Sequence, residues 1–307
     1  MKPDSLPTPT SEHAPTRRYR IRDAAQTAPR PEPGLYLVAT PIGNLGDVTL
    51  RGLELIAGAD RLACEDTRVT AKLLARFGIE RRMTAYHEHN AEEAGAALLA
   101  DLAAGLSVAL VSDAGTPLVS DPGYRLVREA IAADIPVVPI PGASAALAAL
   151  LASGLPSDSF FFAGFPPQKE QARASRLEDL ARIPGTLVFF EAPHRIADSL
   201  AAMQGAFGPR QAAVCRELTK AFETIYRGTL AELAAEFAAM ERVRGEIVVC
   251  IAPPDAPQAA SEADADAILT GLLAEMKPTQ AAQEAARLTG LGRRDLYQRA
   301  LALKDRR

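Results

Sequence analysis

Residues 106–123 read Leu-Ser-Val-Ala-Leu-Val-Ser-Asp-Ala-Gly-Thr-Pro-Leu-Val-Ser-Asp-Pro-Gly, an apolar run followed by a loop rich in glycine, proline and aspartate. The run from Leu106 to Val111 is apolar at five of its six positions, which predicts a buried parallel strand. Glycine lets a ligand come close to the backbone, proline stiffens the loop, and open α/β sheets bind small molecules at such loops. The loop lacks both the Gly-Lys-Ser/Thr ending of a P-loop and the Gly-x-Gly-x-x-Gly fingerprint. We therefore expect a ligand other than a nucleoside triphosphate or NAD.

The same alternation of strand, loop and helix continues on both sides of this segment, over residues 34–153. Strands are expected at 35–39, 61–65, 106–111 and 137–140, and helices at 49–59, 68–77, 90–105, 124–133 and 145–153. Short connections between alternating strands and helices predict a parallel sheet with helices on its faces.

Residues 154–254 predict a second α/β domain. Its strands are expected at 160–163, 186–190, 212–216, 224–227 and 246–251, and its helices at 168–182, 196–207 and 230–240. The connection between the third and fourth of these strands is too short for a crossover helix, so this sheet is expected to be mixed.

The two ends of the chain differ from this pattern. Residues 1–33 hold seven prolines and little periodicity, so we expect a disordered tail, and its basic cluster at 17–22 either contacts RNA or is simply solvated. Residues 255–264 are expected to be a linker. Three helices at 265–276, 279–288 and 293–304 predict a small helix-turn-helix-like domain over 265–307. Seven basic and two acidic residues after position 286 suit RNA contact, although a solvated final helix would have the same composition.

Composition excludes several classes of protein. The chain has 307 residues, 48% hydrophobic, with a formal charge of −4, so it is not a polyanion binder as a whole. It has neither an apolar stretch of membrane-spanning length nor the hydrophobic segment of a signal peptide. Cys64, Cys215 and Cys250 lie far apart in apolar surroundings, which predicts buried, reduced thiols and a cytosolic protein. His87 and His89 are too few for a metal site, and no Gly-x-Ser-x-Gly hydrolase motif is present.

Four loops rich in glycine or proline follow predicted strands, at 40–47, 112–123, 141–145 and 191–195. Together they suggest one shared crevice. The first three contain no Lys or Arg, which disfavours a phosphate-rich ligand. Asp47, Asp113 and Asp121 suit a cationic ligand, although Asp113 could equally serve as a helix or turn cap.

These loops, together with Cys64-Glu-Asp-Thr67, Tyr86-His-Glu-His-Asn90 and Arg216-Glu-Leu-Thr-Lys220, resemble the tetrapyrrole methylase superfamily over roughly residues 34–254. Within it they are similar to the enzymes that methylate small-subunit ribosomal RNA. The resemblance implies two consecutive α/β domains of that type, with S-adenosylmethionine bound between them as methyl donor. It further implies 2′-O-methylation of a cytidine ribose in the decoding region, on free RNA or the assembled small subunit, by a homodimer. Porphyrin-modifying relatives carry a Gly-Gly-Asp-Pro type of loop where this chain has Ala114-Gly-Thr-Pro117. This difference weakens the case for a porphyrin substrate.

Residues can be named for three roles, the first from the resemblance and the other two from their chemical type. The cofactor contacts implied are Ile42, Asp113, Ala114, Gly115, Thr116, Val119, Ser144, Ala145, Glu191 and Leu218. Candidates for a general base are Glu65, Asp66, His87, Glu88, His89 and Glu217. Candidates for RNA contact are Arg68, His194, Arg195, Arg216, Lys220, Arg293, Arg294 and Arg299.

Structural roles compete with these assignments. Asp66 could instead cap a helix, either histidine could be a packed core residue, and Glu217 could pair with Arg216 or Lys220. Glu65 and Glu88 could simply be solvated. Two other functions also remain open: a methyltransferase of the same superfamily that acts on a tetrapyrrole or a protein side chain, and a ribosome assembly factor without catalysis.

Overall fold

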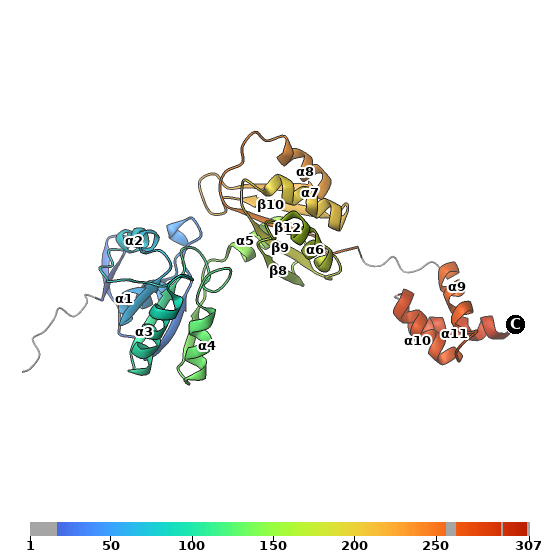
Figure 1. The fold of residues 1–307 in the computed structure, drawn as a ribbon, viewed down its shortest axis with the longest axis horizontal. Helices are drawn as coiled ribbons and strands as arrows, with labels where there is room; N and C mark the ends of the chain where they lie inside the picture. The colour runs from blue at the N-terminus through green and yellow to red at the C-terminus, as the bar shows by residue number, and fades with distance from the viewer. Residues whose placement is uncertain (1–16, 256–261, 290, 306–307) are drawn as a thin grey trace, which may run out of the picture. The chain divides into compact units, whose positions relative to one another are not determined.

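The computed structural model describes residues 17–255, 262–289 and 291–305. They divide into two compact units, one comprising the residues up to 181 and 185–252, the other 182–184 and the residues from 253 onward. Both α/β domains lie in the first unit (Figure 1).

The first sheet is parallel throughout, as predicted. Its strand order is β5 (Thr84–Ala85), β4 (Arg61–Cys64), β6 (Ser107–Val111), β3 (Gly34–Val38) and β7 (Val137–Ile140). The two-residue strand β5 is the one member that the sequence did not reveal, because so short a segment has no readable periodicity.

Helices cover both faces of this sheet. On one face lie α1 (Leu50–Gly58) and α2 (Thr67–Arg76), and on the other α3 (Ala91–Ala103) and α4 (Tyr124–Ala132). Successive strand residues point to opposite faces, so Tyr36 packs in the α1 and α2 cluster while Leu35 packs with α3 and α4.

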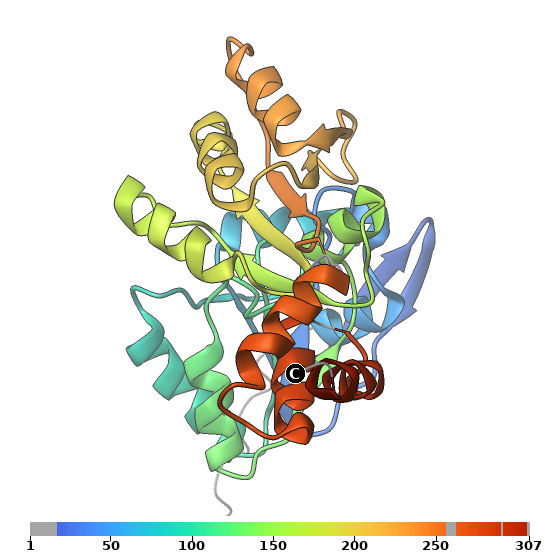
Figure 2. The ribbon, with the colours of Figure 1, turned by 90° about the vertical axis from the view of Figure 1, so that its right-hand side faces the viewer.

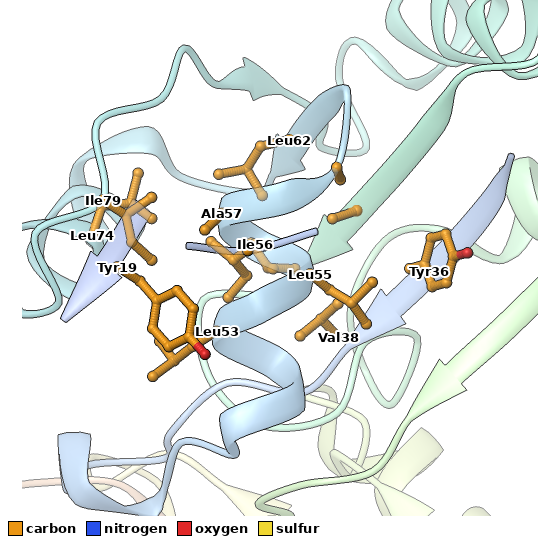
Figure 3. Close-up of a cluster of buried hydrophobic side chains, with 14 of the residues drawn as sticks. Tyr19, Tyr36, Val38, Leu53, Leu55, Ile56, Ala57, Leu62, Leu74 and Ile79 are labelled. Atoms are coloured by element: carbon orange, nitrogen blue, oxygen red, sulfur yellow. The ribbon is translucent and has the colours of Figure 1, made fainter. Parts of the chain in front are cut away.

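The expectation of a disordered tail over 1–33 is wrong for its described part, residues 17–33; residues 1–16 lie outside the described residues. Strands β1 (Arg18–Ile21) and β2 (Ala24–Thr27) form an antiparallel hairpin. Tyr19 is 4% exposed, and Figure 3 shows its ring beside Leu53 in the cluster around α1. Its hydroxyl donates to Glu54 at 3.2 Å. One buried aromatic side chain anchors the hairpin, and a proline-rich composition does not reveal such a contact.

Asp60 fixes both ends of this segment to the sheet. Its carboxylate accepts hydrogen bonds from Arg17 and Arg30, each at 3.0 Å, and from the Ser107 hydroxyl at 2.8 Å. Burial would raise the pKa of Asp60, but the hydrogen bonds from Ser107 and Arg30 hold it below its ordinary value. Arg17, from the basic cluster considered for RNA contact, is therefore engaged within the fold.

The second sheet is mixed, as predicted. Its order is β11 (Thr224–Thr229), β10 (Gln211–Arg216), β12 (Ile247–Ile251), β9 (Thr186–Glu191) and β8 (Phe160–Gly164), with only β8 and β9 parallel. Three helices, α6 (Glu170–Leu180), α7 (Ile196–Phe207) and α8 (Leu230–Ala238), lie together on one side of it in Figure 1.

Helix α5 (Ala145–Ser153), which we assigned to the first domain, packs on the second sheet instead. Ala149 and Leu150 belong to the same buried cluster as Val188 and Ala213 of that sheet. By packing, the border between the two domains therefore lies before α5, and the loop after β7 crosses it.

The second unit is a group of three helices, α9 (Glu262–Leu272), α10 (Pro278–Thr289) and α11 (Arg293–Asp305), seen in red in Figures 1 and 2. Their shared core is mostly alanine and leucine, including Leu269, Ala285 and Leu296. Helix α9 begins within the predicted linker, of which residues 256–261 lie outside the described residues.

Two further expectations can be compared with the structure. The three cysteines are free and buried, as predicted. No helix in the described parts of the chain is both long and apolar enough to cross a bilayer.

Candidate functional site

Three of the predicted ligand loops meet at one edge of the first sheet. They follow β3, β6 and β7, which are neighbouring parallel strands, so their carboxyl ends lie side by side. Thr40 and Gly115 exchange backbone hydrogen bonds of 2.9 and 3.0 Å, and the Thr116 hydroxyl donates to the Ala143 carbonyl at 3.2 Å. Hydrogen bonds thus join all three loops into one surface.

Gly115 lies in this surface in a backbone conformation that side chains rarely adopt. Its φ is +83°, in the left-handed region that favours glycine, and an added Cβ would lie 3.2 Å from Cγ2 of Ile42. Leu118 and Ser120 also have positive φ, of 70° and 66°. Non-glycine residues in this conformation are typical of functional loops.

A cavity of about 360 Å³, called the first cavity below, opens at this surface and is bounded by both α/β domains. Eight of the ten predicted cofactor contacts line it: Ile42, Ala114, Gly115, Thr116, Val119, Ser144, Ala145 and Glu191. The predicted contacts that line the first cavity therefore come from four separate loops.

The first cavity is poor in positive charge. None of its lining residues is Lys, Arg or His, whereas Asp121, Glu191 and Glu246 are acidic. Burial raises the pKa of Asp121 above its ordinary value, against the lowering effect of a hydrogen bond from Ser112. Such a lining suits a cationic or neutral ligand better than a phosphate.

Glu191 has a structural role in this wall. Its side chain is fully buried and accepts hydrogen bonds from Arg195, from the Ser199 hydroxyl and from the Ala192 amide. Arg195 is itself only 16% exposed, so the two form a buried ion pair at the start of α7. Glu191 therefore holds the 191–195 loop in place.

We expect Glu191→Ala to lower the free energy of unfolding by about 3 kcal/mol or more, because it leaves the Arg195 guanidinium buried without its counter-charge. Glu191→Gln, which keeps a hydrogen-bond acceptor, should cost less. Urea unfolding followed by circular dichroism measures both. An unfolding midpoint for Glu191→Ala equal to that of the wild type would contradict this role.

The other two predicted cofactor contacts do not line the first cavity. Leu218 is buried and packs with Ile42 in the cluster under α5. Asp113 lines an adjoining hollow of about 360 Å³, the second cavity, which shares Ile42, Ala114 and Glu246 with the first. One carboxylate oxygen of Asp113 accepts a hydrogen bond from the Asp66 amide at 2.9 Å, and burial raises the pKa of Asp113.

None of the six candidate bases lines the first or the second cavity. Asp66 caps α2 and is held by Arg68, whose hydrogen bonds lower the pKa of Asp66 to about 2. Glu217 pairs with Lys220 at 2.8 Å, and this contact lowers the pKa of Glu217. Both are thus placed in the structural roles that competed with catalysis.

The remaining four candidates lie near the carboxyl end of β4 and in the loop before α3. Burial, together with the charges of Asp121 and Asp113, raises the pKa of Glu65. The rings of His87 and His89 lie edge to face, 6.0 Å apart, and His89 and Glu88 are exposed.

The structure separates the RNA-contact candidates into two groups. Five are engaged within the protein: Arg68 with Asp66, Arg195 with Glu191, Arg216 with the carbonyls of Phe222 and Arg244, Lys220 with Glu217 and Glu246, and Arg299 with Asp266. The other three, His194, Arg293 and Arg294, are exposed and form no hydrogen bond or ion pair with any described residue.

Apart from Glu191, sequence reasoning missed the residues that the second domain supplies to the first cavity. Phe165 and Phe190 pack edge to face, 5.6 Å apart, and residues 245–248 enter from the start of β12. Nothing in a plain apolar strand such as β12 marks which end faces a ligand. An exposed phenylalanine directly after a strand, as Phe165 is, was the one available signal.

Two family models match the chain. Tetrapyrrole (Corrin/Porphyrin) Methylases matches residues 34–234, and RsmI C-terminal HTH domain matches residues 259–304.

Curated relatives and solved structures agree with these matches. Ribosomal RNA small subunit methyltransferase I of Mesorhizobium japonicum is 62% identical over 275 residues, covering 89% of this chain and 93% of that protein. The protein of the same name from Escherichia coli O157:H7 is 45% identical over 278 residues, covering 90% of this chain and 97% of that protein. The methyltransferase CobJ shares the fold, with a TM-score of 0.54 and 21% identity, over 72% of this chain and 94% of its own. Diphthine synthase does so as well, with a TM-score of 0.56 and 18% identity, over 71% of this chain and 89% of its own.

Proposed function

Because the chain belongs to the tetrapyrrole methylase family, and within it to the ribosomal RNA small subunit methyltransferases I, we propose that it transfers a methyl group from S-adenosylmethionine to a ribose 2′-oxygen of small-subunit ribosomal RNA. The target proposed is a cytidine of the decoding region. The observation that carries this is the first cavity, which lies between the two α/β domains and is lined by no basic residue.

The first cavity fits the cofactor. Its volume lies within the range of small-molecule sites, and its lining combines apolar side chains with exposed loop backbone. Gly115, Thr116 and Ser144 would hold the polar ends of the cofactor, with Ile42 and Val119 against its apolar surface. When bound, S-adenosylmethionine supplies an electrophilic methyl group on a sulfonium cation, and a lining without Lys or Arg does not repel that charge.

The acceptor hydroxyl needs a group that takes its proton as the new oxygen–carbon bond forms. Three carboxylates line the first cavity. Glu191 already accepts hydrogen bonds from Arg195 and Ser199, and Glu246 pairs with Lys220 at 3.1 Å. Asp121 has no such ion pair with a described residue, and its raised pKa makes its carboxylate a stronger base than that of an ordinary aspartate. We propose Asp121 as the proton acceptor in place of the six candidates suggested by the sequence.

The C-terminal helices are proposed to contact RNA, chiefly through the exposed Arg293 and Arg294 at the start of α11. A chain that ends at Pro254 should bind S-adenosylmethionine within about twofold of the wild type, because the first cavity lies wholly in the other unit. Its methylation of subsaturating small subunits should fall about tenfold or more, because basic contacts to phosphate are lost. Isothermal titration and a methyl-transfer assay measure the two effects. Loss of cofactor binding in the shortened chain would contradict the division of roles.

A cytosolic homodimer is proposed as the working form. In support, the side chain of Phe160 on the edge strand β8 is 44% exposed, and those of Leu147 and Leu151 on α5 are 48% and 78% exposed. Exposed apolar side chains at an unpaired sheet edge are typical of contacts between chains. Sedimentation equilibrium of the full chain distinguishes a dimer from a monomer.

The deciding experiment is methyl transfer from labelled S-adenosylmethionine to small ribosomal subunits from a strain that lacks the gene. Alkali does not cleave the RNA chain next to a 2′-O-methylated ribose. Label in an alkali-resistant dinucleotide is the expected result. Cofactor binding without any label in RNA would reject the proposal.

A further inference from the structure

We propose that the loop of residues 240–246, together with His194, forms a phosphate-binding surface for the RNA strand beside the methyl-transfer site. This proposal rests on the proposed function, because it takes RNA as the substrate. It is carried by a hollow of about 520 Å³, called the basic groove below, whose lining includes His194, Arg242 and Arg244.

The basic groove adjoins the first cavity. Both are lined by Pro193 and Gly245, so the two hollows meet along the 191–195 loop and the entry to β12. A ribose presented to the methyl group of the cofactor at the first cavity is therefore near the basic groove, and the strand attached to it has a path across that groove.

The charge of the basic groove differs from that of the first cavity. Arg242 and Arg244 are exposed, and no described residue forms a hydrogen bond or ion pair with either guanidinium. One acidic side chain, Glu241, lines the groove with them, which leaves an excess of positive charge. Free guanidinium groups bind phosphate without giving up an internal partner, unlike Arg195 or Arg216.

The backbone that presents these two arginines is held firmly. The Arg244 carbonyl accepts a hydrogen bond from the Arg216 guanidinium at 3.3 Å, and the Glu246 amide donates to the Glu217 carboxylate at 2.9 Å. Gly245 has a φ of +92°, and an added Cβ would lie 2.4 Å from Cγ of Glu217. Arg216 and Glu217, two residues that the sequence suggested for RNA contact and catalysis, therefore act as positioning residues for this loop.

The test compares the double variant Arg242→Gln/Arg244→Gln with the matched control Lys169→Gln/Arg176→Gln. The control removes the same charge from exposed, unpaired residues at α6, and neither of them lines the first cavity, the second cavity or the basic groove. Binding of each full chain to small ribosomal subunits is measured from 0.1 M to 1 M salt. S-adenosylmethionine binding of each variant reports whether the protein is folded.

Each lost contact to a single-stranded phosphate lowers the slope of log affinity against log salt by about 0.7. We expect the slope of the double variant to be smaller by about 1.4. Its affinity deficit relative to the wild type should therefore be roughly 25-fold larger at 0.1 M salt than at 1 M salt. The control should keep the wild-type slope, and all chains should bind S-adenosylmethionine equally.

Two outcomes would overturn the proposal that the basic groove binds phosphate: a double variant with the wild-type salt slope, or a control that loses as much slope as the double variant. Failure of the proposed function is seen separately, as absence of methyl transfer by the wild-type chain. The binding experiment measures the contribution of the basic groove in either case, since it does not depend on catalysis.

Discussion

Asp121→Asn is expected to lower the rate of methyl transfer at saturating substrates by about 10²–10⁴-fold, the usual contribution of a general base. The amide keeps the size and polarity of the side chain but does not accept a proton at neutral pH. A carboxylate acts as a base only when ionised, so the wild-type rate should rise with pH through the raised pKa of Asp121. The variant should lack that rise.

Single-turnover rates from about pH 4, just above the ordinary pKa of an aspartate, up to pH 8 measure this effect, and Glu246→Gln is the matched control. Glu246 lines the same cavity, but its carboxylate is 73% exposed and paired with Lys220, so its loss should change the rate far less. S-adenosylmethionine should bind the Asp121 variant with near wild-type affinity. Weak cofactor binding at an unchanged maximal rate would show that Asp121 anchors the cofactor instead.

Gly115→Val is expected to weaken S-adenosylmethionine binding by about hundredfold, or about 2.8 kcal/mol. A β-branched residue is strained at a φ of +83°, and its Cβ would lie 3.2 Å from Cγ2 of Ile42. The loop would have to shift, and it would take with it the paired backbone hydrogen bonds to Thr40 that join two walls of the first cavity.

The matched control for this substitution is Gly154→Val. Gly154 ends α5 with a φ of +77°, and an added Cβ there would meet no atom within 4 Å. Both variants should lose similar stability from backbone strain, about 1–3 kcal/mol, but only the Gly115 variant should lose cofactor affinity. Equal cofactor binding by the two variants, measured by isothermal titration, would contradict the role of Gly115.

Local sequence patterns determine most of this fold. Apolar runs of strand length, helical spacing and loop glycines predicted the parallel sheet, the mixed sheet and the three C-terminal helices, because each pattern reflects contacts within one element. The family resemblance implied eight of the residues that line the first cavity. Seven of them lie on loops or a helix start that follow the neighbouring parallel strands β6, β3 and β7, whose carboxyl ends share one edge of the sheet, and Glu191 comes from the second sheet.

The tertiary structure alone decided which side chains are free to act. Asp66, Glu217, Arg195 and Lys220 are all of the right chemical type for a site, yet each is held by a partner within the protein. Asp121, Arg242 and Arg244 carry no such ion pair among the described residues. Asp121 lies in the loop that the sequence marked, whereas Arg242 and Arg244 line a groove that no motif marks. Two charged groups pair only when they lie close together in space, and packing between elements sets that distance. The spacing of residues along one element therefore indicates which chemistry a site contains, while the assembled fold determines which groups carry it out.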